Sequence, residues 1–375
     1  MSPVPKAALY YHKNSVWASA PLLALEEKGY GADEVDLKEV DLSTGENFAP
    51  AYLRLNPHAT VPTLVVPLQN TLNSEIESRY KAIQDSKSIV EFLDKSRSSQ
   101  SRTHTTSSAP APALTPATIA YNSTSHKVID LLHSDAADPN AFVYFNARDD
   151  AALRELSAEV LPLLNAKADA LARLIQENAS AEVHVSDKTM KFWEMKKLAS
   201  DGILAVMQHG DTPTDQLDAE AQAKRAEYFK VANAAWGGLG DVMLQLSKEI
   251  IGPFVLGMLL HLDFIFPAEG DAFTIFTGDQ LSLADLHLAA WLARIVKLAG
   301  GTASDDGDTI TKKLEVHIGG AFKLPNDFSV AEARRRAGLP AGTAQPNDRQ
   351  ARVAAFWDAM KERSSWKKVY ADGLH

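Results

Sequence analysis

The chain has 375 residues, of which 45% are hydrophobic and 23% charged, and its formal net charge is −10. This length predicts two domains with a substantial core, and the acidic balance argues against a general nucleic-acid-binding surface, which needs clustered lysine and arginine. There is no cysteine, which excludes disulfides, thiolate metal ligands and a cysteine nucleophile. Any sulfur chemistry must therefore use the sulfur of a ligand.

Two segments bear on targeting and membrane insertion. Residues 1 to 8 lack the charged and apolar regions of a secretory signal. Residues 250 to 268 are apolar over about the length of a bilayer-spanning helix, but they contain glycine, proline, histidine and aspartate. This pattern predicts a buried helix interrupted by a bend, no membrane span, and a cytoplasmic protein.

Strands and helices alternate over residues 1 to 95. The apolar and alternating segments predict strands and helices in turn, at residues 7 to 11, 18 to 28, 35 to 40, 48 to 55, 61 to 67 and 86 to 95. Gly29 is placed to end the first of the helices. Residues 68 to 81 are expected to connect two strands of a hairpin. Such alternation predicts a mixed α/β domain.

The rest of the chain changes character twice. Residues 96 to 125 are rich in serine, threonine, proline and alanine, which predicts a flexible linker or an insertion. Residues 126 to 375 then predict an all-helical domain, with helices at residues 151 to 178, 187 to 207, 219 to 250, 281 to 298 and 349 to 363. Residues 299 to 347 are rich in glycine, aspartate and proline and predict a loop-rich insertion.

Four segments carry a family resemblance: residues 56 to 64 (NPHATVPTL), 84 to 89 (QDSKSI), 278 to 285 (GDQLSLAD), and the aromatic pattern of residues 356 to 369. In this order, and with strands and helices around the first two, they resemble cytosolic glutathione transferases, most of all divergent, fungal-like members with long insertions. The resemblance implies an α/β thioredoxin-like N-terminal domain followed by an all-α C-terminal domain.

The resemblance also implies a glutathione site. Pro62 would follow a cis peptide bond, and Val61 would offer its backbone N–H and C=O groups to the cysteinyl part of glutathione. Asp85 and Ser86 would hold the γ-glutamyl end, because a helix N-terminus attracts a carboxylate and Asp85 could meet the ammonium group. In the helical domain, Ser282 and Asp285 would form a capping box.

Three residues compete to activate the glutathione thiol. A hydrogen bond to the sulfur favours its charged form and lowers the thiol pKa. Counting back from Gly29 places Ser15 and Tyr11 where serine-type and tyrosine-type family members carry their hydroxyl. Ser15 is preferred because it lies in the loop before the first helix, and Asn14 is a third possible donor. Alternatively, Tyr11 packs in the domain interface and Ser15 only caps the helix.

The chain departs from the family pattern two residues before Pro62. Many members have a basic residue there for the glycyl carboxylate of glutathione, whereas this chain has Thr60. His58, Lys13 or Arg54 could replace it. The eleven histidines show no paired metal-binding spacing, so no metal site is expected.

These observations predict a glutathione-dependent transferase with a role in detoxification. Glutathione would be the co-substrate, and its thiolate would add to an electrophilic, largely apolar small molecule. A related lyase, ether-cleaving or isomerase reaction would use the same thiolate. The resemblance implies a homodimer, whose interface the insertions could block. The alternative is a non-catalytic binding or scaffold protein on the same fold, favoured by the insertions and by Thr60.

Overall fold

The computed structural model describes residues 6–67, 80–98, 107–180, 184–250, 252–255, 280–340, 342 and 344–375. Of the connection expected at residues 68 to 81, residues 68 to 79 lie outside these ranges, as does most of the apolar stretch at residues 250 to 268. Within them, no helix is both long and apolar enough to cross a membrane.

The N-terminal part is built on a four-stranded sheet in the order β2-β1-β3-β4. β1 runs parallel to β2 and antiparallel to β3, which in turn pairs antiparallel with β4. Leu9 and Leu64 lie opposite each other in neighbouring strands and are fully buried, so they anchor the middle of the sheet. The strands span Ala7–Tyr11 (β1), Val35–Glu39 (β2), Thr63–Pro67 (β3) and Tyr80–Ile83 (β4).

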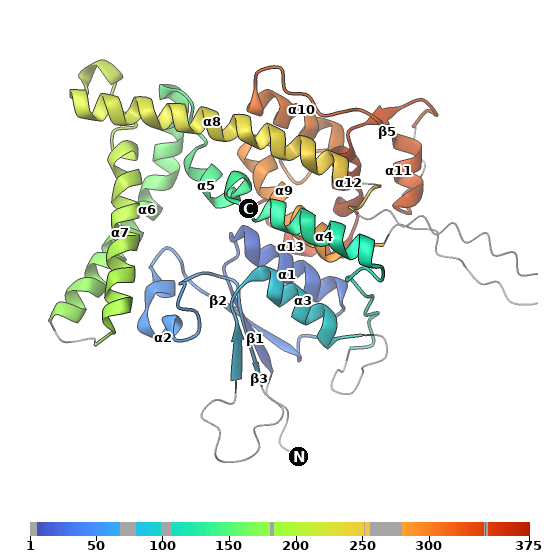
Figure 1. Cartoon of the computed structure of the whole chain (residues 1–375), viewed down its shortest axis with the longest axis horizontal. Coiled ribbons are helices and arrows are strands. Elements are labelled where there is room, and N and C mark those ends of the chain that lie inside the picture. Colours follow the sequence, from blue (N-terminus) through green and yellow to red (C-terminus); the bar gives the residue numbers. More distant parts are fainter. Residues whose placement is uncertain are drawn as a thin grey trace, which may run out of the picture.

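Three helices and a 3-10 turn complete this layer, with α1 and α3 together against the sheet (Figure 1). Gly29 ends the first helix with φ +65°, a conformation that glycine adopts without strain. A Cβ atom at Gly29 would also lie 2.6 Å from Ala109, so the close approach of the later chain requires glycine. The bounds are Val16–Glu27 (α1), Glu46–Phe48 (η1), Pro50–Leu53 (α2) and Ser86–Ser96 (α3).

Residues 107 to 118 belong to the segment expected to be a flexible linker or an insertion; they are irregular and hydrogen-bonded to the α/β layer. Asp94 accepts hydrogen bonds from the backbone N–H groups of Leu114 and Thr115, both at 2.9 Å, and pairs with the buried Lys28 at 2.8 Å. Burial works to raise the pKa of Asp94, but hydrogen bonds from Lys28 and Thr115 outweigh it and lower the pKa. Composition does not indicate these contacts, because the partners lie far away in sequence.

The remainder of the described chain is predominantly helical, which confirms the predicted fold class of a thioredoxin-like α/β part followed by a helical part. Two 3-10 turns, Asp135–Ala137 (η2) and Thr214–Gln216 (η3), lie between helices. A two-residue ribbon, β5 (Phe328–Ser329) with β6 (Arg349–Gln350), interrupts the otherwise helical part. The helices are Ile119–Leu132 (α4), Pro139–Tyr144 (α5), Asp150–Ala179 (α6), Asp187–Met207 (α7), Ala219–Glu249 (α8), Leu283–Leu298 (α9), Gly307–Ile318 (α10), Val330–Arg336 (α11), Arg352–Lys361 (α12) and Ser364–Val369 (α13).

Helix α9 lies at the centre of the helical part and packs against α1, α4 and α5 (Figure 1). It begins with a capping box in which Asp285 accepts from the backbone N–H of Ser282 at 2.7 Å. The second oxygen of Asp285 accepts from the backbone N–H of Val255 at 2.7 Å. Burial raises the pKa of Asp285 to about 6. This cap fixes the helix that carries cavity residues at its other end.

Helices α6 and α7 form an antiparallel arm that reaches down beside α2 (Figure 1). A small apolar cluster joins the arm to the α/β layer, with Phe48 and Ala59 on one side and Leu171, Leu174 and Trp193 on the other. The indole N–H of Trp193 donates to the backbone carbonyl of Phe48 at 3.1 Å. The arm therefore docks on the segment between β2 and β3.

Candidate functional site

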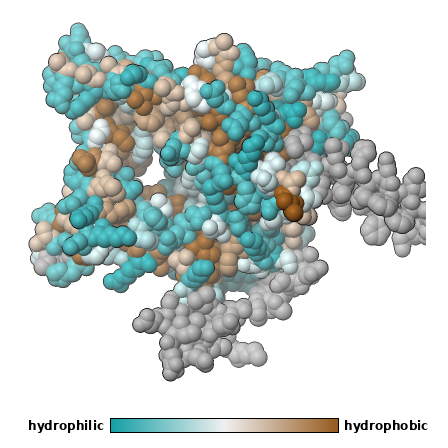
Figure 2. Space-filling model, in the orientation of Figure 1, coloured by the Kyte–Doolittle hydropathy of each residue, from teal (hydrophilic) through white to brown (hydrophobic). Residues whose placement is uncertain are grey.

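A cavity of about 720 Å³ lies where the α/β layer, the arm and α9 meet. In the space-filling view the surface is open between the arm and the rest of the molecule (Figure 2). The α/β layer contributes His12, Asn14, Ser15, Trp17, Leu42, Ser43, Asn47, Phe48, His58, Ala59, Thr60, Val61, Pro62, Gln84, Asp85, Ser86 and Lys87. The helical part contributes His133, Asn140, Val143, Tyr144, Glu159, Leu163, Leu164, Lys167, Lys196, Arg294, Lys297 and Leu298.

The N-termini of two helices reach this cavity. α1 begins after Ser15 and α3 begins after Asp85, and both capping residues line the cavity. The first turn of an α-helix has backbone N–H groups without partners inside the helix, and its dipole is positive there. The two helix ends therefore favour an anionic ligand such as a thiolate or a carboxylate.

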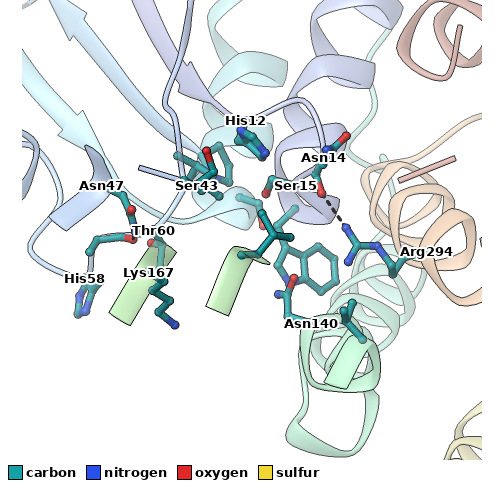
Figure 3. A pocket seen from close by; sticks show the side chains of 18 of the residues that line it. His12, Asn14, Ser15, Ser43, Asn47, His58, Thr60, Asn140, Lys167 and Arg294 are labelled. Carbon is teal, nitrogen blue, oxygen red and sulfur yellow. Dashed lines mark hydrogen bonds between the residues drawn. The ribbon is translucent and has the colours of Figure 1, made fainter. Parts of the chain in front are cut away.

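Of the three candidates for thiol activation, Ser15 and Asn14 line the cavity. The side chain of Ser15 makes no capping hydrogen bond, so its hydroxyl is available to a ligand, and Figure 3 shows it beside His12 and Asn14. Tyr11 and Lys13 are not among the described residues that line the cavity. Burial, followed by the charge of Glu39, raises the pKa of Tyr11, which makes its hydroxyl a weaker donor.

His12 is a cavity residue that sequence reasoning missed. Its Nδ1 atom lies 3.1 Å from the backbone carbonyl of Val40. Because a carbonyl oxygen only accepts, Nδ1 must carry a proton in this hydrogen bond. The side chain lies close to Ser15 in the loop before α1 (Figure 3). His12 therefore contributes an imidazole ring to this end of the cavity.

Residues 58 to 62 form the turn that enters β3, and the Val61–Pro62 peptide bond is cis. Buried Asn56 supports the turn by donating from Nδ2 to the carbonyl of Thr60 at 2.8 Å and to Oγ1 of Thr63 at 3.0 Å. His58, Val61 and Pro62 all line the cavity. The turn thus brings to the cavity Val61, which the sequence suggested for the cysteinyl part of glutathione, together with Pro62 and His58.

Asp85 and Ser86 lie beside that turn, at the start of α3. The carboxylate of Asp85 accepts from the backbone N–H of Ser88 at 2.9 Å and remains solvent-exposed. Gln84 donates to the carbonyl of Leu55 at 2.9 Å, which joins the start of α3 to the chain before the turn. The structure therefore brings together Ser15, Asn14, His58, Val61, Pro62, Asp85 and Ser86.

Arg294, on α9, brings a cation to the α1 end of the cavity. It donates to the backbone carbonyl of Asn14 at 2.7 Å (Figure 3). Burial lowers the pKa of Arg294, and the charges of Tyr370, Tyr144 and Glu159 partly oppose this. Its Nε atom is buried and has no hydrogen-bond partner in the described part of the chain.

Lys167 and Lys196 are two further cations that the sequence did not single out. They reach the cavity from α6 and α7, respectively. With Lys87, Arg294 and Lys297 they outnumber the two carboxylates of the lining, Asp85 and Glu159. A chain with net charge −10 thus has a cavity rich in positive charge. The helical spacing of Lys167 and Lys196 did not indicate that they are cavity residues, because lysines on amphipathic helices usually face solvent.

Aromatic and apolar side chains occupy the wall between α1 and the helical part. The ring of Trp17 stacks on that of His133 with 3.7 Å between centroids. His133 in turn lies 3.1 Å from Nδ1 of His287, which is fully buried. Burial and the nearby charge of Lys87 lower the pKa of His133 to about 4. The pair is therefore neutral near pH 7, and this wall can contact an apolar ligand.

Within the described ranges, no group of three or more histidine or acidic residues is arranged to hold a metal ion.

The chain is similar to known proteins over part of its length. Residues 14–96 match the model of the glutathione S-transferase N-terminal domain. The tetrachloro-p-hydroquinone reductive dehalogenase of Sphingobium chlorophenolicum is 42% identical over 72 residues, which are 19% of this chain and 28% of the relative. The chain thus matches less than a third of that relative's length.

Two solved structures are also similar to the chain. The β-etherase LigF of Sphingobium sp. strain SYK-6 aligns with 98% of this chain and 100% of its own, at 14% identity and a TM-score of 0.44. Glutathione transferase Omega 3C of Trametes versicolor aligns with 97% of this chain and 89% of its own, at 14% identity and a TM-score of 0.40.

The family model covers the strands and helices that carry the cis turn and the N-terminus of α3. Residues 14–96 therefore match a glutathione S-transferase N-terminal domain.

Proposed function

We propose that the protein is a glutathione-dependent enzyme that adds the glutathione thiolate to an electrophilic, largely apolar small molecule. The observation that carries the proposal is the convergence of the α1 and α3 N-termini with the Val61–Pro62 turn on one cavity. Because each helix end favours negative charge, the same cavity suits a thiolate at α1 and a carboxylate at α3.

Each part of glutathione has a proposed partner. The γ-glutamyl carboxylate lies at the N-terminus of α3 with Ser86, and its ammonium group meets Asp85. The backbone of Val61 binds the cysteinyl part. The sulfur then lies at the N-terminus of α1, where the hydroxyl of Ser15 donates to it. The 720 Å³ of the cavity leaves room for a second substrate.

His12 and Arg294 complete the proposed chemistry. Nε2 of His12 accepts the thiol proton, and the sulfur then forms its bond to the electrophilic carbon. Arg294 stabilises negative charge on the electrophile or on its leaving group, since its guanidinium lies beside the loop that carries Ser15 (Figure 3). The aromatic wall at Trp17 and Tyr144 contacts the apolar part of the second substrate.

The proposed class of second substrate is based on the aromatic wall of the cavity and on the names of similar proteins. One relative is named a reductive dehalogenase and a similar structure is a β-etherase. Both names describe breaking a bond from carbon to halogen or oxygen, which thiolate attack at that carbon also achieves. We therefore propose aryl or alkyl compounds with such a leaving group. We also propose that the protein is a cytoplasmic homodimer. Analytical ultracentrifugation tests the oligomeric state.

The test is the pKa of the thiol of bound glutathione, measured from the ultraviolet absorbance of the thiolate. We expect a thiol pKa below that of a free cysteine thiol, about 8.5, in the native protein and a higher one in Ser15→Ala. A thiol pKa that is the same bound and free would refute thiolate activation and leave the non-catalytic binding protein as the better account.

A further inference from the structure

The α6–α7 arm places two lysines in the cavity with no acidic partner. Lys167 on α6 and Lys196 on α7 line the cavity and are half-buried. The ion pairs within these helices join other residues, Arg173 with Glu177 and Lys197 with Asp201. In the described part of the chain, no ion pair includes Lys167 or Lys196.

Holding two half-buried cations in one cavity without an acidic partner has a free-energy cost. Buried cations are normally paired, because removing them from water costs free energy. Burial, followed by the like charge of Lys196, lowers the pKa of Lys167. The carboxylate on the same face of the arm, Glu159, precedes Lys167 by eight residues, about 12 Å along an α-helix, and its charge acts on Arg294 instead. An anion between the two lysines would remove this cost.

The lysines lie at the end of the cavity away from α3. α3 follows β4 at one edge of the sheet, whereas η1 and α2 follow β2 at the opposite edge. The arm docks on η1 and α2 through Phe48 and Trp193. Figure 3 shows Lys167 on the side of Thr60 and His58, far from Arg294. A ligand held at α3 by one end therefore extends across the turn towards the arm.

We infer that Lys167 and Lys196 bind a ligand carboxylate, and that this is the glycyl carboxylate of glutathione. The inference rests on the proposed function. Glutathione has carboxylates at both ends and an extended length of about 10 Å. With its γ-glutamyl end at Asp85 and its cysteinyl part at Val61, its other carboxylate points towards the arm. The arm thereby supplies a positive charge that the turn itself lacks at Thr60.

The test compares glutathione with its glycyl monoethyl ester, which has no charge at that end. Calorimetric titrations would give the Kd of both ligands for the native protein, Lys167→Met and Lys196→Met. The control is Lys191→Met, an exposed lysine on α7 that does not line the cavity. Circular dichroism and the Tm would confirm that each variant folds.

We expect Lys167→Met to weaken glutathione binding about tenfold, as the loss of a charged hydrogen bond predicts, and to change ester binding less than twofold. Lys196→Met should show the same pattern, and Lys191→Met should change neither. If the substitutions weaken the binding of both ligands equally, or of neither, the inference is wrong. The proposed function still stands in that case, provided that the native protein binds glutathione.

Two further outcomes separate the possible sources of the carboxylate. If Lys167→Met leaves glutathione affinity unchanged but raises KM for 4-chloro-3-nitrobenzoate and not for its methyl ester, the lysines bind an acidic second substrate and the glycyl assignment is wrong. If the native protein binds neither glutathione nor its ester, the proposed function fails and the inference fails with it.

Discussion

The α/β layer and the α6–α7 arm contribute to the cavity in different ways. The layer offers groups that the backbone fixes, namely two helix ends and a cis turn supported by Asn56. The arm offers the ends of two long side chains and is joined to the layer by one apolar cluster and by the hydrogen bond from Trp193. The α/β layer therefore fixes the position of the ligand's reacting atom. The position of the arm's two lysines depends on how the arm docks on the layer.

The largest expected effect tests the layer. Ser15→Ala should lower turnover with a model aryl chloride about 100-fold, because a hydrogen bond to a charged group contributes about 1.5–3 kcal/mol. Tyr11→Phe should change turnover less than twofold, since Tyr11 is outside the described lining. Steady-state kinetics at saturating glutathione provides both numbers. The reverse ranking would assign the activating hydroxyl to Tyr11.

The charge at the start of α3 is the next test of the layer. Asp85→Asn keeps an N-cap acceptor for the N–H of Ser88 but removes the negative charge opposite the ligand's ammonium group. We expect about tenfold weaker glutathione binding and an unchanged Tm. Fluorescence titration and thermal unfolding measure the two quantities. Unchanged affinity would place the γ-glutamyl end elsewhere.

Gly45 tests the docking of the arm. It has φ +74°, and a Cβ atom there would lie 2.5 Å from the Cβ of Ala170 on α6. Gly45→Ala should destabilise the protein by about 2 kcal/mol, from the left-handed backbone and the clash together. It should also weaken glutathione binding a fewfold, because the arm moves away.

The matched control for this variant is Gly300→Ala. Gly300 has φ +77°, but a Cβ atom there would meet nothing within 4 Å in the described part of the chain, so only the backbone cost of about 1 kcal/mol applies. Denaturant unfolding compares the two variants. Equal destabilisation, with unchanged glutathione affinity in both, would show that the arm does not depend on this contact.

The smallest expected effect concerns the boundary between the layer and the helices. The pKa of His133 is lowered to about 4 by burial and by Lys87, below about 6.5 in the unfolded chain. The stability from neutral His133 is therefore complete above pH 6.5 and is lost as the pH falls towards 4. When the pH is lowered from 7 to 5.5, the free energy of unfolding should fall by about 1 kcal/mol more in the native protein than in His133→Gln. Urea unfolding at both pH values measures these free energies. An equal decrease in the native protein and in His133→Gln would contradict the prediction.

Much of the α/β layer could be predicted from the sequence, because its signals are local. Short alternating strands, Gly29 after the first helix and the NPHATVPTL segment each act over a few residues. The same holds for Ser282 and Asp285, which are three residues apart and bond to each other. The long helices α6, α7 and α8 were also predicted closely, since their apolar residues repeat at helical spacing.

The rest depends on contacts between distant segments. His12 is held by the backbone carbonyl of Val40, which is 28 residues away. Lys167 and Lys196 enter the cavity only because Trp193 meets Phe48, a pairing across 145 residues. The order of residues 107 to 118 likewise depends on Lys28 and Asp94. Composition and periodicity do not encode these pairings, so they did not identify Lys167, Lys196 and Arg294 as cavity residues.

A crystal structure of the protein with reduced glutathione tests the central claim most directly. The account predicts the γ-glutamyl carboxylate at the N-terminus of α3, the sulfur within hydrogen-bonding distance of Ser15 Oγ, and the glycyl carboxylate between Lys167 and Lys196. Glutathione bound outside this cavity, or with its sulfur remote from the N-terminus of α1, would contradict it.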